Sequence, residues 1–327
     1  MRFALMIEPQ QGLSYEELLA IVRNAESVGF ESFFRSDHYA SFPGERGLPT
    51  TDAWATLAGL ARETNRISLG TLVSPVTFRI PGSFAKVVTT VDEMSGGRVE
   101  VGVGAGWHEE EHRQLGIPFP SRAERLDMVE EELAILHGLW TEPDGWSFEG
   151  RQWQVRDALF RPRPLQRPGR RHPHLIVGGE GKPRGTRIAA RFADEFNLVS
   201  ARPRLARETF ERVREACRDV GREPDELVYS AMTGVLVAAS EDELRDRVRD
   251  QLALYGGSGG SGDSGADGDR WLAERRDRWI MGTPEQALER IAQFEAAGVQ
   301  RLMLQDFLPR DLEMVRLIGA EVLPQAS

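Results

Sequence analysis

Residues 97–112 read GRVEVGVGAGWHEEEH, and this stretch decides the fold class of the chain. Val99, Val101 and Val103 have the spacing of a buried strand, which runs into glycines at positions 102, 104 and 106. Glycine has no side chain, so a flat ligand or a phosphate can lie directly against the backbone at such positions. In parallel α/β folds, ligands bind at the carboxyl ends of the strands. The stretch therefore predicts an enzyme that uses a bound cofactor.

Apolar runs of strand length alternate with amphipathic segments of helix length along the whole chain. The runs that we predict as strands are residues 3–7, 32–35, 67–73, 99–103, 174–177, 195–199, 228–238 and 301–305. Helices are expected over 14–29, 52–64, 83–94, 123–140, 186–192, 205–219, 284–297 and 312–322. Eight strand–helix units in order predict an α/β fold, a (β/α)8 TIM barrel that forms a single domain over residues 1–327. A doubly wound sheet is the alternative, and it would require a topological switch point.

Two insertions interrupt this pattern, after the fourth and the seventh strand. Residues 144–155 (DGWSFEGRQWQV) alternate polar and aromatic side chains around a glycine, which predicts a small hairpin. Residues 256–269 (GGSGGSGDSGADGD) are half glycine, so we expect a flexible insert that buries no apolar surface. A lid that gates the substrate is the alternative reading of this second insertion.

Composition limits the class of protein. Hydrophobic residues make up 40% of the chain and charged residues 28%, and the formal net charge is −10, which argues against a nucleic-acid partner. Cys217 is the only cysteine, so neither an internal disulfide nor a cysteine-based metal cluster is expected. The sequence has no recognisable signal peptide and no apolar run of membrane-spanning length. We therefore expect a cytoplasmic enzyme that acts on a small molecule and has no membrane partner.

Two motifs in the opening stretch match known signatures only superficially. His108–His112 fits the zinc-protease pattern H-E-x-x-H, but it directly follows a glycine-rich strand end, and Gly116 and Pro118 follow soon after. The glycines at 102, 104 and 106 do not complete the dinucleotide pattern G-x-G-x-x-G, because Trp107 stands at its last position. We predict no metal site and no Rossmann-type nicotinamide site.

Two other strand ends carry candidate functional residues. Gly178, Gly179 and Gly181 end the fifth strand just before a helix that contains Thr186, an arrangement typical of phosphate binding. A tight strand-to-helix turn is the simpler alternative for these glycines. His38 follows Asp37 at the end of the second strand, where an imidazole is well placed for acid–base catalysis.

Taken together, these segments resemble the luciferase-like monooxygenase superfamily, and most closely its members that use the deazaflavin coenzyme F420. The resemblance covers nearly the whole chain apart from the glycine-rich insert. The segments that carry it are SDH (36–38), ISLGTLVSPVTFR (67–79), VDEMSGGRVEVGVGAGW (91–107), EHRQLGIPFPSRAERLDMVEEEL (111–133), HLIVGGEG (174–181) and TRIAARFADEFN (186–197).

The resemblance implies a TIM barrel with the flavin or deazaflavin lying across its carboxyl mouth. It makes His38 the catalytic histidine and places a non-proline cis peptide bond between Leu72 and Val73, next to the cofactor ring. Combined with the glycine patterns above, it gives these cofactor-binding candidates: Asp37, Leu72, Val73, Ser74, Gly104, Ala105, Gly106, Trp107, Gly178, Gly179, Gly181 and Thr186.

The sequence departs from the pattern of its apparent relatives at two positions. Gly102 stands where many FMN-dependent relatives have asparagine, which favours F420 over FMN. Trp107 stands where sugar-phosphate dehydrogenases of the F420 branch have a catalytic glutamate, so Glu109 or Glu110 would have to replace it.

We therefore expect an F420-dependent oxidoreductase that transfers a hydride to or from a small organic substrate, and the resemblance suggests a homodimer. The alternatives are an FMN-dependent monooxygenase of the same superfamily and a protein that binds the cofactor without redox activity.

Overall fold

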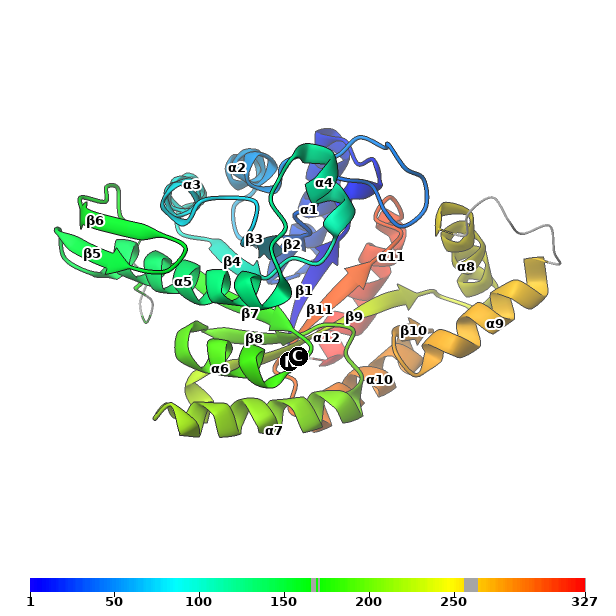
Figure 1. The fold of residues 1–327 in the computed structure, drawn as a ribbon. Coiled ribbons are helices and arrows are strands. Elements are labelled where there is room, and N and C mark those ends of the chain that lie inside the picture. Colours follow the sequence, from blue (N-terminus) through cyan, green and yellow to red (C-terminus); the bar gives the residue numbers. More distant parts are fainter. Residues whose placement is uncertain (166–168, 170, 256–263, 327) are drawn as a thin grey trace.

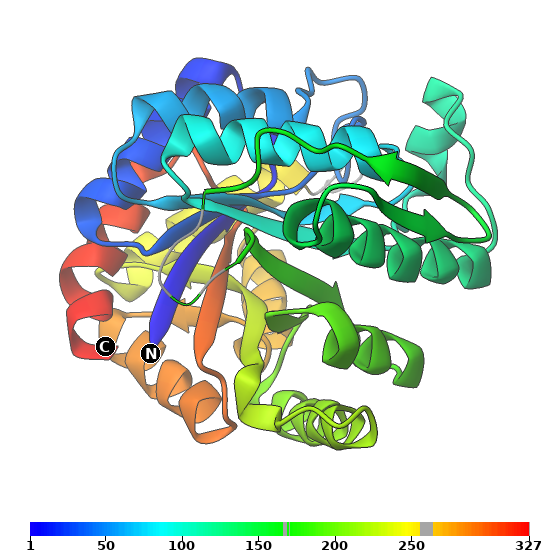
Figure 2. The same ribbon diagram turned by 90° about the vertical axis from the view of Figure 1, so that its left-hand side faces the viewer.

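The computed structural model describes residues 1–165, 169, 171–255 and 264–326, and their parallel strands close into a barrel surrounded by helices (Figures 1 and 2). Going around the barrel, the neighbouring strands are β11, β1, β2, β3, β4, β7, β8 and β9, and β9 pairs with β11 to close the ring. Their bounds are β1 Arg2–Ile7, β2 Ser32–Arg35, β3 Ser68–Pro75, β4 Val99–Gly104, β7 His174–Gly179, β8 Glu195–Leu198, β9 Val228–Val237 and β11 Arg301–Asp306. The predicted TIM barrel is confirmed, and closure of the ring excludes the doubly wound sheet.

The outer ring of helices follows the predicted order, with one more helix than predicted. The members of this ring are α1 Tyr15–Val28, α2 Ala53–Glu63, α3 Pro81–Ser95, α5 Arg122–Thr141, α6 Pro183–Phe192, α7 Pro203–Asp219, α8 Glu241–Tyr255, α10 Pro284–Ala296 and α11 Leu312–Leu317. The additional helix is α8, which has no counterpart among the predicted ranges. Local sequence explains where several of them begin. Ser14 and Glu17 form a capping box on α1, and Ser121 and Glu124 form another on α5.

Three short elements were not expected from the sequence. Strand β10 (Ile280–Gly282) pairs with the end of β9, helix α4 (Glu109–Leu115) follows β4, and α12 (Leu323–Ala326) ends the described chain. Each is too short for its hydrophobic periodicity to be recognised. The two ends of the described chain meet, since the amino group of Met1 donates to the carbonyl of Ala326 at 3.1 Å (Figure 2).

The first insertion forms the predicted hairpin. Strands β5 (Trp146–Glu149) and β6 (Gln154–Ala158) are antiparallel and lie beside α5 at the edge of the molecule (Figure 1). In the second insertion, residues 256–263 lie outside the described residues. Residues 264–269, expected to be part of the flexible insert, instead begin helix α9 (Ser264–Arg276). The buried side chains of Trp271 and Leu272 anchor this helix further along, and helix formation then extends back towards its start.

The core has two layers. The larger layer fills the space between the strands and the helices. The smaller layer fills the barrel interior, with Ala4, Met6, Phe34, Leu72, Ile176 and Met303. Among the described residues, no helix is long and apolar enough to cross a membrane. The homodimer and the cytoplasmic location stay predictions.

Candidate active site

A cavity of about 1190 Å³ opens at the carboxyl ends of the barrel strands. Its wall includes residues at or just after the ends of β1, β2, β3, β4, β7, β8 and β11, together with the first turns of α5 and α6. This is the end of a TIM barrel at which catalytic residues gather. The apolar floor includes Met6, Leu72, Val73 and Met232, which belong to or pack against the inner core.

Ten of the thirteen residues expected at the site line this cavity, and three do not. The ten are His38, Leu72, Val73, Gly104, Ala105, Gly106, Trp107, Gly178, Gly179 and Gly181. The structure therefore brings residues from four separate strand ends to one opening, as the sequence analysis expected.

Asp37, Ser74 and Thr186 are expected to contact the cofactor, but they lie behind the cavity wall. Ser74 Oγ donates to Asp37 Oδ2 at 2.7 Å, and Arg79 forms an ion pair with the same carboxylate. Thr186 Oγ1 donates to the carbonyl of Pro183 at 2.9 Å. These three side chains are therefore occupied by protein partners. Asp37 and Ser74 join β2 to β3, and Thr186 bonds within the first turn of α6.

The peptide bond between Leu72 and Val73 is cis, as the resemblance implies. Next to it, the glycines of β4 make room for β3. A Cβ at position 104 would lie 2.5 Å from Val73 Cγ2, and one at position 102 would lie 2.3 Å from the carbonyl oxygen of Thr71. Val73, rather than a ligand, therefore occupies the space beside these two glycines. This differs from the bare backbone surface that the opening stretch predicts.

His38 and Glu111 form a hydrogen-bonded pair in which His38 faces the cavity. His38 Nδ1 lies 2.9 Å from Glu111 Oε1, and the backbone N–H of Tyr39 donates to Glu111 Oε2 at 3.0 Å. Burial alone would raise the pKa of the Glu111 carboxyl, but the hydrogen bond and charge of His38, the backbone N–H of Tyr39 and the charge of His108 together outweigh burial and lower it. The ionised carboxylate holds a proton on Nδ1, which leaves Nε2 of a neutral His38 ring as a proton acceptor.

The sequence analysis did not identify Glu111, although it lies within the H-E-x-x-H match. The two histidines of that match have different surroundings. His108 stacks on Phe42 with ring centres 4.1 Å apart, and its Nδ1 lies 3.9 Å from Glu111 Oε1. His112 Nε2 lies 2.7 Å from Thr77 Oγ1. Glu111 differs from its neighbours in its hydrogen bond with His38, which lies 73 positions earlier in the chain, so no local sequence pattern identifies it.

Glu109 and Glu110, the acids suggested as substitutes near Trp107, do not line the cavity. Glu109 is exposed, and Glu110 forms an ion pair with Arg46 at 3.2 Å. Both side chains lie on α4 away from the opening. Trp107 itself is 65% exposed at the cavity mouth, with its ring centre 5.8 Å from that of His38.

One side of the cavity carries more positive than negative charge. Arg122, Arg125, Lys182 and Arg184 line it where α5 and α6 begin. The carboxylate of Glu180 lines it too and pairs with Lys182 at 2.7 Å, and Arg184 pairs with Asp127. Helix N-termini with cationic side chains form a typical phosphate site, because free backbone N–H groups point out of the first turn.

Two glycines on the cationic side leave empty space that no protein group fills. A Cβ at Gly179 or Gly185 would meet no atom within 4 Å, and neither residue has a positive φ. Local packing therefore does not require glycine at these positions. Open space beside cations and helix N-termini fits a phosphate-bearing cofactor.

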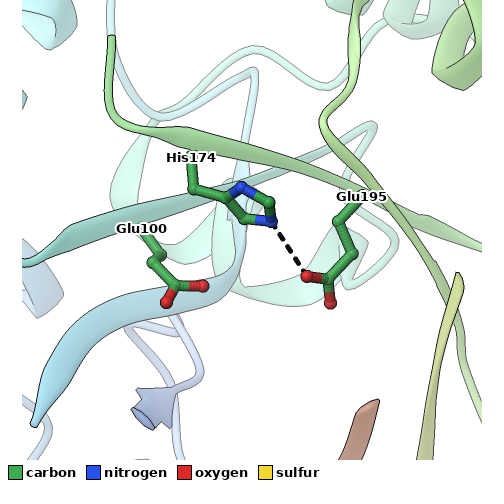
Figure 3. A group of neighbouring side chains, drawn as sticks. All are labelled: Glu100, His174 and Glu195. Carbon is green, nitrogen blue, oxygen red and sulfur yellow. Dashed lines mark hydrogen bonds and ion pairs between the residues drawn. The ribbon is translucent and has the colours of Figure 1, made fainter. Parts of the chain in front are cut away.

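A cluster with the composition of a metal site lies at the opposite, amino end of the barrel. Glu100, His174 and Glu195 place potential ligand atoms within 4.8 Å of one another, and His174 Nε2 lies 2.9 Å from Glu195 Oε2 (Figure 3). Arg301 Nη1 donates to Glu100 Oε2 at 2.7 Å and to Glu195 Oε2 at 3.0 Å. The guanidinium supplies the positive charge that a metal ion would supply, so we assign this cluster a structural role.

The comparisons with known proteins agree with this geometry. The sequence model of the luciferase-like monooxygenase family matches residues 1–301. An F420-dependent glucose-6-phosphate dehydrogenase of Microbacterium testaceum is 30% identical over 321 residues, which cover 94% of this chain and 93% of the relative. An FMNH(2)-dependent dimethylsulfone monooxygenase of Pseudomonas putida is 29% identical over 332 residues, which cover 95% of this chain and 87% of the relative. The solved structure of an F420-dependent secondary alcohol dehydrogenase with an F420-acetone adduct has the same fold, with a TM-score of 0.82, 22% identity, and coverage of 100% of this chain and 99% of that one.

Proposed function

The chain belongs to the luciferase-like monooxygenase family, and from this premise we propose that it is an F420-dependent oxidoreductase that acts on a small organic substrate. One observation carries the proposal: a single cavity holds the His38–Glu111 pair and, on the side of α5 and α6, a cationic region with open space at Gly179 and Gly185. The F420-dependent relatives support this choice of cofactor.

The residues on the side of α5 and α6 would hold the phosphate part of the cofactor. Lys182 and the exposed Arg122 supply positive charge, and the first turn of α6 supplies backbone N–H donors. Val73 would support the ring from below, because it forms part of the cavity floor beside Gly104. When bound, F420 supplies a carbon centre that accepts or donates a hydride.

His38 would move the proton that accompanies the hydride. When an alcohol is oxidised, its carbon gives up a hydride and its hydroxyl gives up a proton, which His38 Nε2 can accept. In the reverse direction, protonated His38 returns the proton to the substrate oxygen. Glu111 stabilises the imidazolium form in both directions, because its carboxylate accepts from Nδ1.

An FMN-dependent monooxygenase is the second candidate, supported by the similarity to the dimethylsulfone enzyme. The ground for preferring F420 is the sequence comparison at Gly102, where many FMN-dependent relatives have asparagine. In the structure this glycine makes room for the carbonyl of Thr71, so its packing does not itself distinguish the two cofactors. The third reading, a protein that binds the cofactor without redox activity, predicts tight binding and no turnover with any substrate.

Titration of the purified protein with F420 and, separately, with FMN tests the proposal. We expect F420 to bind at least tenfold more tightly than FMN, as measured by quenching of cofactor fluorescence. The variant Gly179→Val should weaken F420 binding at least tenfold and leave the melting temperature unchanged, because a Cβ there meets no protein atom within 4 Å and the position lines the cavity. Gly82→Val is the control, since a Cβ there would also meet no atom within 4 Å but the position lies outside the cavity wall. Tighter binding of FMN would replace the proposal with the monooxygenase.

A further inference from the structure

We propose that the substrate carries a hydrogen-bond donor, a hydroxyl or an amine, on an apolar body and has no anionic group. This inference rests on the proposed function, because it assigns one side of the cavity to the cofactor and the other side to the substrate.

Barrel topology separates the two sides. In the ring of eight strands, β7 lies directly across from β1, with three strands between them on each side. The lysine and arginine side chains on the cavity wall belong to the first turns of α5 and α6, on the side of β4 and β7. Within the described part of the chain, no lysine or arginine lines the cavity beside β1, β2, β9 or β11. A phosphate or carboxylate group of the substrate would therefore find no lysine or arginine there.

The charged group on the side of β1 is the carboxylate of Glu8, which faces two glutamine amides. Gln305 Nε2 donates to Glu8 Oε1 at 2.6 Å, and Gln10 Nε2 donates to Glu8 Oε2 at 2.7 Å. Gln11 directs its amide donor to backbone carbonyls of Phe42 and Pro43. The glutamine donors are thus turned towards protein acceptors, while the carboxylate keeps this side negative. Such a lining accepts hydrogen bonds from a substrate and repels an anion.

Apolar and aromatic groups form the rest of this side. Phe42 and Trp107 pack edge to face with ring centres 5.2 Å apart, and Tyr255 and Phe307 pack with ring centres 5.9 Å apart. Burial, followed by the negative charge of Glu8, raises the pKa of Tyr255, which places this phenol within the field of the carboxylate. Tyr255 Oη donates to the carbonyl of Phe307 at 3.0 Å, so its proton is also turned away from the cavity. Aromatic walls around an acceptor suit an apolar body with one donor group.

Three ligands that share one ring test this preference: benzyl alcohol, benzylamine and benzyl phosphate. Their affinities are measured by calorimetry on protein saturated with F420, so that the cationic side is already occupied. We expect the alcohol and the amine each to bind at least tenfold more tightly than the phosphate. Glu8→Gln should reduce this discrimination at least threefold. The control Glu63→Gln removes a surface carboxylate that lies outside the cavity wall and should leave the discrimination unchanged.

The inference is overturned if benzyl phosphate binds as tightly as the alcohol and the amine, or more tightly. It is also overturned if Glu8→Gln prefers the alcohol and the amine over the phosphate as strongly as the parent does, or if neither the alcohol nor the amine binds. A fluorescence titration on the same preparation keeps the two proposals separate. If F420 does not bind, the proposed function fails. Benzyl alcohol and benzylamine still report on Glu8 in the cofactor-free protein, because neither is attracted to the cationic side.

Discussion

Replacing Glu111 by glutamine should change which nitrogen of His38 carries the proton. The carboxylate accepts from two donors, His38 Nδ1 at 2.9 Å and the backbone N–H of Tyr39 at 3.0 Å. A glutamine side chain of the same shape has only one acceptor oxygen. If that oxygen stays on Tyr39, the new NH₂ group faces Nδ1, and the proton of a neutral ring moves to Nε2.

The expected loss follows from the strength of this hydrogen bond. A hydrogen bond to a charged group contributes about 1.5–3 kcal/mol, and 1.4 kcal/mol corresponds to about a tenfold change in rate. Glu111 is only 1% exposed, so water does not replace the lost partner. We therefore expect turnover to fall about 10- to 100-fold for any substrate that the F420-loaded enzyme converts, with F420 affinity within about threefold of the parent.

The tautomer can be measured independently of turnover by ¹⁵N NMR of the histidine rings, with His38 assigned by comparison with His38→Ala. The parent protein should show Nδ1 protonated in the neutral ring, and Glu111→Gln should show Nε2 protonated. Glu110→Gln is the matched control, because this neighbour on α4 pairs with Arg46 on the surface. An unchanged tautomer in Glu111→Gln, or turnover equal to that of the parent, would refute the positioning role of Glu111.

Three further predictions concern buried charge. Arg301→Met leaves the carboxylates of Glu100 and Glu195 buried without their positive partner, so the free energy of unfolding measured in urea should fall by about 3–5 kcal/mol. The control Arg2→Met removes an exposed ion pair and should lower it by less than about 1 kcal/mol. Burial raises the pKa of Glu195, but Arg301, His174 and Ser230 together outweigh burial and lower it to about 2. The stabilising effect of this carboxylate is therefore present above pH 4.5 and is lost as the pH falls towards 2; a parent protein equally stable at pH 2 and pH 5 would contradict this. Burial raises the pKa of Glu132 to about 8, so between pH 4.5 and 8 the folded protein keeps a proton that the unfolded chain releases. The free energy of unfolding should therefore fall as the pH rises from 4.5 to 8. Glu132→Gln removes this dependence and should raise the free energy of unfolding near neutral pH by roughly 3 kcal/mol, whereas equal pH dependence in parent and variant would show that Glu132 is ionised in the fold.

Much of the fold could be predicted because its signals are local. The strands that close the barrel are contiguous apolar runs, and caps such as Ser14 with Glu17 mark helix starts within a few residues. The missed strand β10 has only three residues, too few for an alternation of apolar and polar side chains to be recognised. Residues 264–269 were misread as part of a loop because their composition disfavours structure, while the burial that anchors α9 comes later, at Trp271.

The candidate site could be predicted less completely. His38 and the glycines of β7 were found because strand ends in a barrel converge on one opening. The purpose of Gly102 and Gly104 was misjudged, because the group that fills the space beside them comes from a different strand, β3. The resemblance implies that Asp37 and Ser74 contact the cofactor, but the orientation of the Asp37 carboxylate depends on Arg79, about forty positions further along the chain.

By itself, the sequence determined the order of strands and helices, the closed barrel and the strand ends that surround the cavity, since all of these follow from short-range periodicity and the geometry of parallel strands. Only the tertiary structure decided that Glu111 pairs with His38 and that the cations lie across the barrel from Glu8. Both facts depend on which side chains meet when distant segments pack together. The sequence pattern within one segment does not predict these contacts, because the partners come together only when the ring of strands closes.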